Sequence, residues 1–201
     1  MTDYFPVFLD LRGRRCLVVG GGPIGERKAT ALFECGARVT VVAPVVTAGL
    51  AALAAARRIV HRPRPFETRD VREAALVIAA TGIPATDGAV AAAARRRRLP
   101  VNVVDRPAEC DFILPSVLRR GGLQIAVSTG GRSPALAREI RTALERLFPE
   151  DYAEFVERVG RARARARRSA RTAQGRSRAG ERVVRAALED PRGWGRLRRV
   201  D

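Results

Sequence analysis

The sequence predicts an α/β protein in which residues 1–114 form a parallel sheet with crossover helices, followed by a hairpin with a helix and a small helical domain. Short β-branched runs alternate with alanine-rich stretches before residue 115, which is typical of repeated strand–helix–strand units. These runs are apolar throughout, as expected for strands that helices cover on both faces. Glycines at positions 20, 22 and 25 follow the first run, where a strand would turn into a helix.

Each element of the first domain follows from one of these runs. Strands are expected at 16–19, 38–42, 59–61, 75–79 and 101–104. Helices are expected between them at 25–34, 47–56 and 87–98.

Residues 115–149 are predicted to form a second segment, built from a hairpin and a helix. Extended runs within 112–128 are joined at Gly121-Gly122, a pair suited to a hairpin turn. Ser133 is expected to cap the next helix, Pro134 to occupy its first turn, and Pro149 to end it. The hairpin leaves strand edges that need a partner.

Residues 150–201 are predicted to form a third, basic helical domain. Arginine alternates with alanine in RVGRARARARRSARTAQGRSR, without a clear apolar stripe. A second apolar face follows and predicts a small helical cap that packs back on this segment; it comprises Val183, Val184, Ala187, Leu188, Trp194 and Leu197.

The formal net charge is +17, and Lys28 is the only lysine among 38 basic residues. Such a charge attracts polyanions, which include nucleic acid, a phosphorylated cofactor and a substrate with many carboxylates. The sequence contains no run of 18 apolar residues, and its start lacks the order of a secretory signal, so a membrane partner is not expected. We therefore expect a cytoplasmic protein.

No metal site is expected from the cysteines or the histidine. Cys16, Cys35 and Cys110 form neither a CxxC pair nor a zinc spacing, and their simplest role is as small buried residues. His61 is the only histidine, and a structural or surface role is the simplest for it.

The glycine loop is predicted to bind the pyrophosphate of a dinucleotide in a Rossmann-type fold. Gly20 permits the tight turn, Gly22 lets the backbone approach the pyrophosphate, and Gly25 lets the helix pack closely on the strand. The positive end of the helix favours the anion, although Pro23 offers no amide there. The alternative is a glycine-rich turn without a ligand.

Further cofactor and substrate residues are expected where the other strands end, because ligands of parallel sheets bind at that edge. Ala43, Pro44 and Val45 end the second strand without a carboxylate for the ribose, and no arginine follows at once, which favours NAD over NADP. Thr81 and Gly82 end the fourth strand, and Asn102 and Asp105 belong to the fifth. A capping role at a turn is the alternative for both Asn102 and Asp105.

Four motifs in this order resemble the siroheme synthase amino-terminal family, that is, precorrin-2 dehydrogenase, in some members also sirohydrochlorin ferrochelatase. They are GGGPIGERKA, VNVVD at 101–105, CDFILPS at 110–116 and STGGRSPALAR at 128–138. The resemblance covers roughly residues 4–150 and implies a homodimer with a Rossmann domain, a dimerisation segment and a helical domain.

The resemblance also implies a reaction. NAD⁺ accepts a hydride from precorrin-2, an anionic tetrapyrrole, and sirohydrochlorin is formed. Asp105 is the implied catalytic residue and Pro23, Ile24, Pro44 and Val45 are implied cofactor contacts. We assign Asn102, Ser128, Thr129 and Gly130 to the substrate, although Ser133 capping its helix is the simpler role for that turn.

Departures from the family pattern leave alternatives open. Gly25 stands where alanine is frequent, TGIP replaces a more acidic sequence at 81–84, and Arg106 follows Asp105 where another acid is frequent. Dehydrogenation is therefore the expected activity, and metal insertion stays open. The alternative functions are a nucleotide-sensing module that binds nucleic acid through 158–178, which the lack of aromatic residues there disfavours, and a non-catalytic tetrapyrrole carrier.

Overall fold

The computed structural model describes residues 4–170 and 172–189, which fall into two compact units, Met1–Ile113 and Leu114–Asp201. The predicted end of the first domain at residue 114 lies beside this division, and the predicted boundary at residue 150 stays a prediction. Trp194 and Leu197, expected in a helical cap, lie outside the described residues.

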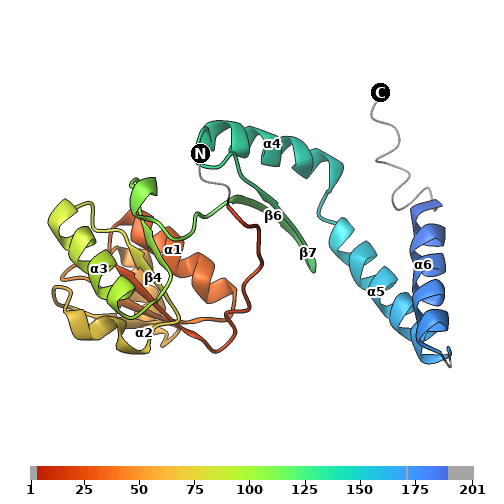
Figure 1. The fold of residues 1–201 in the computed structure, drawn as a ribbon, viewed down its shortest axis with the longest axis horizontal. Helices are drawn as coiled ribbons and strands as arrows, with labels where there is room; N and C mark the ends of the chain where they lie inside the picture. The colour runs from red at the N-terminus through yellow and green to blue at the C-terminus, as the bar shows by residue number, and fades with distance from the viewer. Residues whose placement is uncertain (1–3, 171, 190–201) are drawn as a thin grey trace. The chain divides into compact units, whose positions relative to one another are not determined.

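The first unit is a five-stranded parallel sheet with the strand order β3-β2-β1-β4-β5, which confirms the predicted fold class (Figure 1). Its strands are β1 (Arg15–Val19), β2 (Arg38–Val42), β3 (Val60–Arg62), β4 (Leu76–Ala79) and β5 (Val101–Val103). Its helices are α1 (Pro23–Glu34), α2 (Ala48–Ala55) and α3 (Pro84–Arg96), and η1 (Thr68–Glu73) and η2 (Pro107–Glu109) are 3₁₀ turns. All neighbouring strands run parallel, so their carboxyl ends share one edge.

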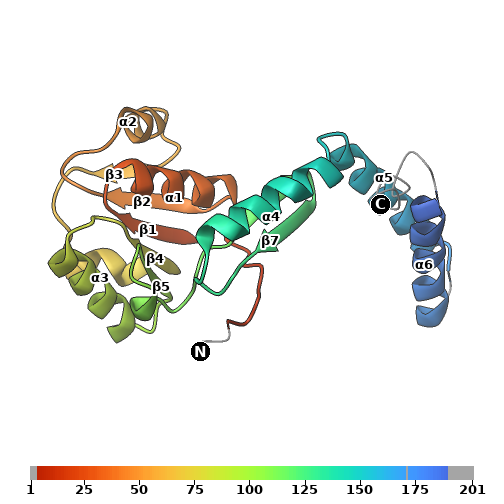
Figure 2. The same cartoon turned by 90° about the horizontal axis from the view of Figure 1, so that it is seen from above.

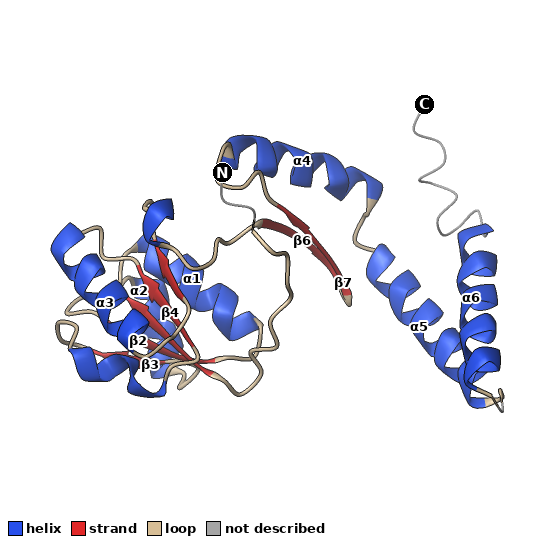
Figure 3. Ribbon diagram, viewed as in Figure 1, coloured by secondary structure: helices blue, strands red, loops and turns tan. Residues whose placement is uncertain are grey.

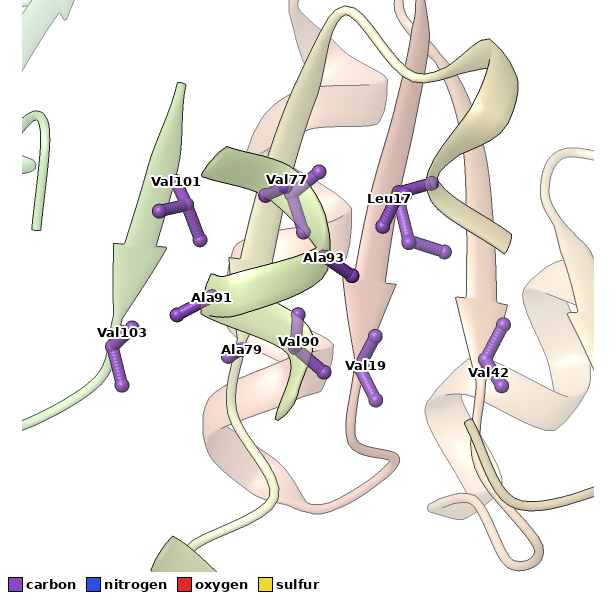
Figure 4. Close-up of a cluster of buried hydrophobic side chains, with 12 residues drawn as sticks. Leu17, Val19, Val42, Val77, Ala79, Val90, Ala91, Ala93, Val101 and Val103 are labelled. Atoms are coloured by element: carbon purple, nitrogen blue, oxygen red, sulfur yellow. The ribbon is translucent and has the colours of Figure 1, made fainter. Parts of the chain in front are cut away.

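Two hydrophobic clusters lie on the two faces of this sheet, which explains why the strands are apolar without alternation. Leu17 and Val19 join one cluster with residues of α3 and η1 (Figure 4), and Cys16 and Val18 join the other with residues of α1 and α2. Figure 2 shows the helices on both sides of the sheet. Helices therefore cover both faces of the sheet, and the loops at the carboxyl ends of its strands are where a ligand can bind.

Prolines move the helix starts relative to the sequence prediction. Helix α1 begins at Pro23 and α3 at Pro84, each with proline in the first turn, whereas the alanine pattern predicted starts at 25 and 87. Proline is favoured at the first helical position because the amide of that residue would have no acceptor within the helix, so its absence costs no hydrogen bond. The 3₁₀ turn η1 was not predicted, and it depends on Asp70.

Asp70 is a buried carboxylate held by two arginines and a backbone amide. Arg62 donates to it at 2.7 Å, Arg64 donates at 2.6 and 2.9 Å, and the Glu67 amide donates at 2.9 Å. Burial by itself raises the pKa of Asp70, but the hydrogen bonds from Arg64, Glu67 and Arg62 outweigh burial and hold this pKa below its usual value.

We expect Asp70→Asn to lower the free energy of unfolding by about 1–3 kcal/mol at neutral pH, because two arginines lose a charged acceptor. A carboxyl with a lowered folded pKa stabilises the fold above its unfolded pKa of about 3.9 and loses this contribution as the pH falls through the folded pKa. The difference between wild type and variant should therefore shrink below about pH 4 in urea titrations. Glu73→Gln, which removes an exposed pair with Arg15, is the control and should cost less than about 1 kcal/mol.

The second unit begins with an antiparallel hairpin of β6 (Ser116–Arg120) and β7 (Leu123–Val127), joined by the predicted Gly121-Gly122 (Figure 3). Helix α4 (Pro134–Leu147) follows, and the Ser133 hydroxyl accepts a hydrogen bond from the Leu136 amide at 3.2 Å, as predicted for a cap. Leu118, Phe148 and Tyr152 form a small core here. Helices α5 (Tyr152–Arg168) and α6 (Ala173–Glu189) pack against each other.

Candidate active site

The glycine turn between β1 and α1 brings three stretches of backbone into close contact. Gly20 has φ +120°, and a Cβ there would lie 2.2 Å from the Ala80 carbonyl oxygen. A Cβ at Gly25 would lie 2.2 Å from the Gly20 carbonyl oxygen, and one at Gly21 would lie 2.2 Å from that of Val45. Gly20 and Gly25 therefore serve the turn and the helix packing that the motif predicted, and Gly21 is an additional requirement that the motif does not contain.

Gly22 differs from Gly20, Gly21 and Gly25 in this turn because it faces open space. It is the N-cap of α1, has extended backbone with φ −77° and ψ −177°, and a Cβ there would have no atom within 4 Å. No side chain caps the helix, and the first amides of a helix have no acceptor within it. Pro23 and Ile24 are exposed beside them. The positive end of α1 is therefore available to an anion such as a pyrophosphate.

The loop after β2 lies beside this turn. The buried Ala43 is held by the His61 ring, whose Nε2 lies 2.9 Å from the Ala43 carbonyl oxygen, and Pro44 and Val45 are exposed. Arg62 is the register partner of Val42 on the neighbouring strand, but its guanidinium is paired with Asp70. The arginine nearest to this strand end is thus already engaged by a carboxylate.

Asp87, which the sequence did not single out, organises the loop after β4. Its buried carboxylate accepts hydrogen bonds from the Thr81 hydroxyl at 2.7 Å and the Thr81 amide at 3.1 Å. The Thr81 hydroxyl also accepts from the Ile83 amide at 3.1 Å. Gly82 has φ +71° and faces open space. Thr81 is therefore held by α3, and Gly82 is the exposed residue of the pair.

Asp105 is exposed in the turn after β5 and has φ +58°, in the left-handed region that aspartate tolerates better than most residues. The buried Asn102 points its amide toward the segment that follows, donating to the Phe112 carbonyl oxygen at 2.9 Å and to the Cys110 sulfur at 3.4 Å. The side chain of Asn102 thus contributes to the support of this turn.

The Cys110 thiol holds the turn from inside. Its Sγ accepts from the Val103 amide at 3.2 Å and lies 3.2 and 3.4 Å from the carbonyl oxygens of Val103 and Arg106, to which the S–H donates. These groups stand on both sides of Asp105 in the chain. Burial raises the pKa of Cys110, so the thiol keeps its proton at neutral pH. The sequence predicted Cys110 as a small buried residue and as the first residue of the CDFILPS motif, and its hydrogen bonds to this turn were not predicted.

We expect Cys110→Ala to lower both stability and turnover, because the turn that carries Asp105 loses these hydrogen bonds and the sulfur's packing. The free energy of unfolding should fall by about 1–2 kcal/mol in urea titrations. Cys110→Ser, whose hydroxyl donates and accepts in the same place, should lie closer to wild type in both measurements. Cys35→Ala near the end of α1 serves as the control for turnover, and equal losses in the two variants would contradict this role.

Ser128, Thr129 and Gly130 belong to the second unit, where they form the turn before α4. The Ser128 hydroxyl accepts from the Gly130 amide at 3.1 Å, and the Thr129 hydroxyl accepts from the Ser133 amide at 2.9 Å. Gly130 has φ +63°. The first unit thus brings Asp105, Asn102 and the cofactor loops to one edge of its sheet. Ser128, Thr129 and Gly130 belong instead to a turn of the second unit.

Across residues 4–170 and 172–189, no three His, Cys, Asp or Glu side chains gather as a metal site. In the same part of the chain, no helix has the length and apolar character needed to cross a bilayer.

The strand order, the glycine turn at the start of α1 and the open loops beside it define a Rossmann-type dinucleotide-binding protein. Residues 7–116 match the family model described as "Putative NAD(P)-binding", and residues 120–147 match the one described as "Sirohaem biosynthesis protein central". The chain therefore belongs to the putative NAD(P)-binding family, and its second unit contains a segment similar to the central part of sirohaem biosynthesis proteins, in agreement with the resemblance seen in its motifs.

Several relatives and a solved structure are similar to the chain. A siroheme synthase of Thioalkalivibrio sulfidiphilus is 49% identical over 77% of this chain, and one of Methylococcus capsulatus is 44% identical over 83%. The chain spans about a third of their length, 32% and 35%. A structure named SirC, precorrin-2 dehydrogenase, superposes with a TM-score of 0.78 at 28% identity, covering 96% of this chain and 92% of that one.

Proposed function

We propose that this protein is an NAD-dependent precorrin-2 dehydrogenase, which oxidises precorrin-2 to sirohydrochlorin. The observation that carries the proposal is the likeness to SirC, a precorrin-2 dehydrogenase, over 92% of that chain, together with an exposed aspartate at the end of β5. The oxidation removes a hydride and a proton from the macrocycle, so that NAD⁺ and precorrin-2 become NADH, sirohydrochlorin and H⁺.

The residues of the first unit fit a dinucleotide. Bound NAD⁺ supplies the hydride acceptor. The backbone at Gly20, Gly22, Pro23, Ile24 and Gly25 holds the pyrophosphate at the positive end of α1, because a Cβ at Gly22 meets no atom and the helix end has no side-chain cap. Ala43, Pro44 and Val45 pack against the adenosine, and Thr81 and Gly82 line the loop after β4.

Asp105 acts as the general base in this proposal. It is exposed, has no hydrogen-bond or ion-pair partner for its side chain among the described residues, and lies on a turn that Cys110 holds in place. A carboxylate so placed accepts the proton that leaves the macrocycle. Ser128, Thr129 and Gly130 are proposed to contact the substrate, whose carboxylates the net charge of +17 attracts. Asn102, which is buried with its amide engaged, is proposed to act on the substrate only through the Asp105 turn that it supports.

The direct experiment is to mix the purified chain with NAD⁺ and precorrin-2 and follow NADH absorbance. We expect NADH and sirohydrochlorin to form in equal amounts. The same assay with NADP⁺ should give a lower kcat/KM, because Arg62 is engaged by Asp70 and no arginine directly follows β2.

Two other outcomes would indicate the alternative functions. A folded chain that binds NAD⁺ and precorrin-2 without forming NADH would be a tetrapyrrole carrier. Salt-sensitive binding of duplex DNA without turnover would indicate a nucleic-acid-binding module. The cytoplasmic location stays a prediction.

A homodimer is proposed from the second unit. An isolated two-stranded sheet is only marginally stable, and α4 exposes Leu136 by 51% and Ile140 by 40%, one turn apart on the helix. A second copy of this surface would cover both residues.

We expect the wild type to sediment as a dimer and the double variant Leu136→Asp, Ile140→Asp to sediment as a monomer with reduced turnover. Arg138→Asp, on a different side of α4, is the matched control and should stay dimeric. A monomeric wild type at assay concentrations would refute the assignment.

A further inference from the structure

Lys28 occupies an unusual position for a charged residue. It lies on α1 in the same stripe as Gly25, Ala29 and Leu32, which are buried at helical spacing against the sheet. Lys28 itself is half-buried, whereas the neighbouring Arg27 is exposed. An ammonium in such a stripe costs free energy unless an anion accompanies it.

Position 28 is also the only place where this sequence uses lysine among its 38 basic residues. Elsewhere arginine meets every requirement for positive charge. The two side chains differ in ways that matter at a binding site, since lysine is a compact point charge and arginine a broad planar fork. The single exception falls on this half-buried position of α1.

The residues around Lys28 connect it to the turn that carries Asp105. Val104, which precedes Asp105, and Phe112 pack against the same hydrophobic cluster as Ala29 and Leu32. Burial lowers the pKa of Lys28, as does Arg27, while Asp105 and Cys110 act on it in the opposite direction and favour its charged form. The residue that precedes Asp105 and the buried face of α1 beside Lys28 thus belong to one hydrophobic cluster, and Asp105 favours the charged form of Lys28.

The two charges do not meet directly. Among the described residues, the side chains of Lys28 and Asp105 share no ion pair within 4.0 Å, and neither has another such partner. The half-buried Lys28 ammonium thus has no carboxylate of the described residues within ion-pair distance. A carboxylate of the substrate would satisfy it and hold the macrocycle beside Asp105.

We propose that Lys28 is a substrate-binding residue that pairs with a carboxylate of the tetrapyrrole at the Asp105 site. The identity of that ligand rests on the proposed function, but the placement of Lys28 beside Asp105 does not. Two measurements separate these parts.

The first measurement requires no turnover. Reductive methylation with ¹³C-formaldehyde labels the α-amine and the single ε-amine of the chain, so that Lys28 gives one resolved NMR signal whose pH titration reports its charge. We expect Asp105→Asn to lower the apparent pKa of Lys28, because the carboxylate favours the ammonium. Glu109→Gln, a carboxylate nearby in the chain that is paired with Arg106, is the control and should leave the titration unchanged. An unchanged titration in Asp105→Asn would overturn the placement.

The second measurement uses the NADH assay. Lys28→Met keeps the length of the side chain without its charge, and we expect KM for precorrin-2 to rise about 10- to 100-fold while the Kd for NAD⁺ stays the same. Lys28→Arg should recover part of the lost affinity for precorrin-2, and Arg27→Met on the exposed side of α1 should behave as wild type.

A wild-type KM in a Lys28→Met variant whose folding is verified by circular dichroism would refute the substrate role. If the wild type itself forms no NADH, the proposed function fails, and the NMR titration still tests the placement.

Discussion

Asp105→Asn is expected to reduce NADH formation about 10²- to 10⁴-fold while leaving the affinity for NAD⁺ unchanged, because the variant loses the general base but keeps the shape of the turn. Asparagine tolerates the φ of +58° at this position as well as aspartate does. The measurement is kcat for precorrin-2 oxidation together with NAD⁺ binding by calorimetry.

Asp105→Ala tests the same role with a different backbone preference. It should also lose turnover and keep NAD⁺ binding, although alanine is less tolerant of the left-handed region and some stability is lost. Glu109→Gln serves as the control for the loss of a carboxylate close by. If Asp105→Asn retained turnover within tenfold of wild type, the proton would have to go to another group. Loss of turnover and NAD⁺ binding together would indicate that Asp105 is structural.

Gly20→Ala should lower the free energy of unfolding by about 2–6 kcal/mol, the sum of a strained backbone and a forced shift of packed atoms. The φ of +120° is one that alanine rarely adopts, and its Cβ would stand 2.2 Å from the Ala80 carbonyl oxygen, which is backbone and does not move aside cheaply. Urea titration followed by circular dichroism measures this loss.

Gly22→Ala is the counterpart, because position 22 has ordinary φ and open space. It should change stability by less than about 1 kcal/mol, the cost of a weaker cap, but reduce NAD⁺ affinity at least about tenfold where its methyl group meets the pyrophosphate. If Gly22→Ala bound NAD⁺ as tightly as wild type, the glycine turn would not be the pyrophosphate site. If both variants were equally stable, the close approach at Gly20 would be wrong.

Much of the fold follows from local patterns. The apolar strand runs, the glycine turn and the proline and serine at the start of α4 each act through neighbours in the chain, so their effect is visible without coordinates. Helices α1 and α3 begin at Pro23 and Pro84, two and three residues before the predicted starts at 25 and 87, although proline at a first helical position is itself a sequence signal.

The polar residues that support the site were harder to find. Asp87 lies six residues from Thr81, and Cys110 lies seven residues from Val103, so only the folded loops bring each pair into hydrogen-bond distance. Asp70 was missed for the same reason, since its partners Arg62 and Arg64 meet it only when the chain turns back after β3. Aspartate is common in loops, and nothing in the spacing of Asp70 or Asp87 separates them from exposed side chains. Cys110 was expected to be buried, but the sequence does not show which backbone groups it contacts.

The sequence by itself determined the class of fold, the family and the aspartate at the end of the fifth strand, because these depend on periodicity, on backbone-permissive glycines and on short contiguous motifs. Only the tertiary structure decided which glycines are sterically required and which side chains hold the turn of Asp105. It also showed that the single lysine is half-buried and that Asp105 favours its charged form. The physical reason is that close approach, burial and charge act through space, between residues that the chain brings together only when it folds.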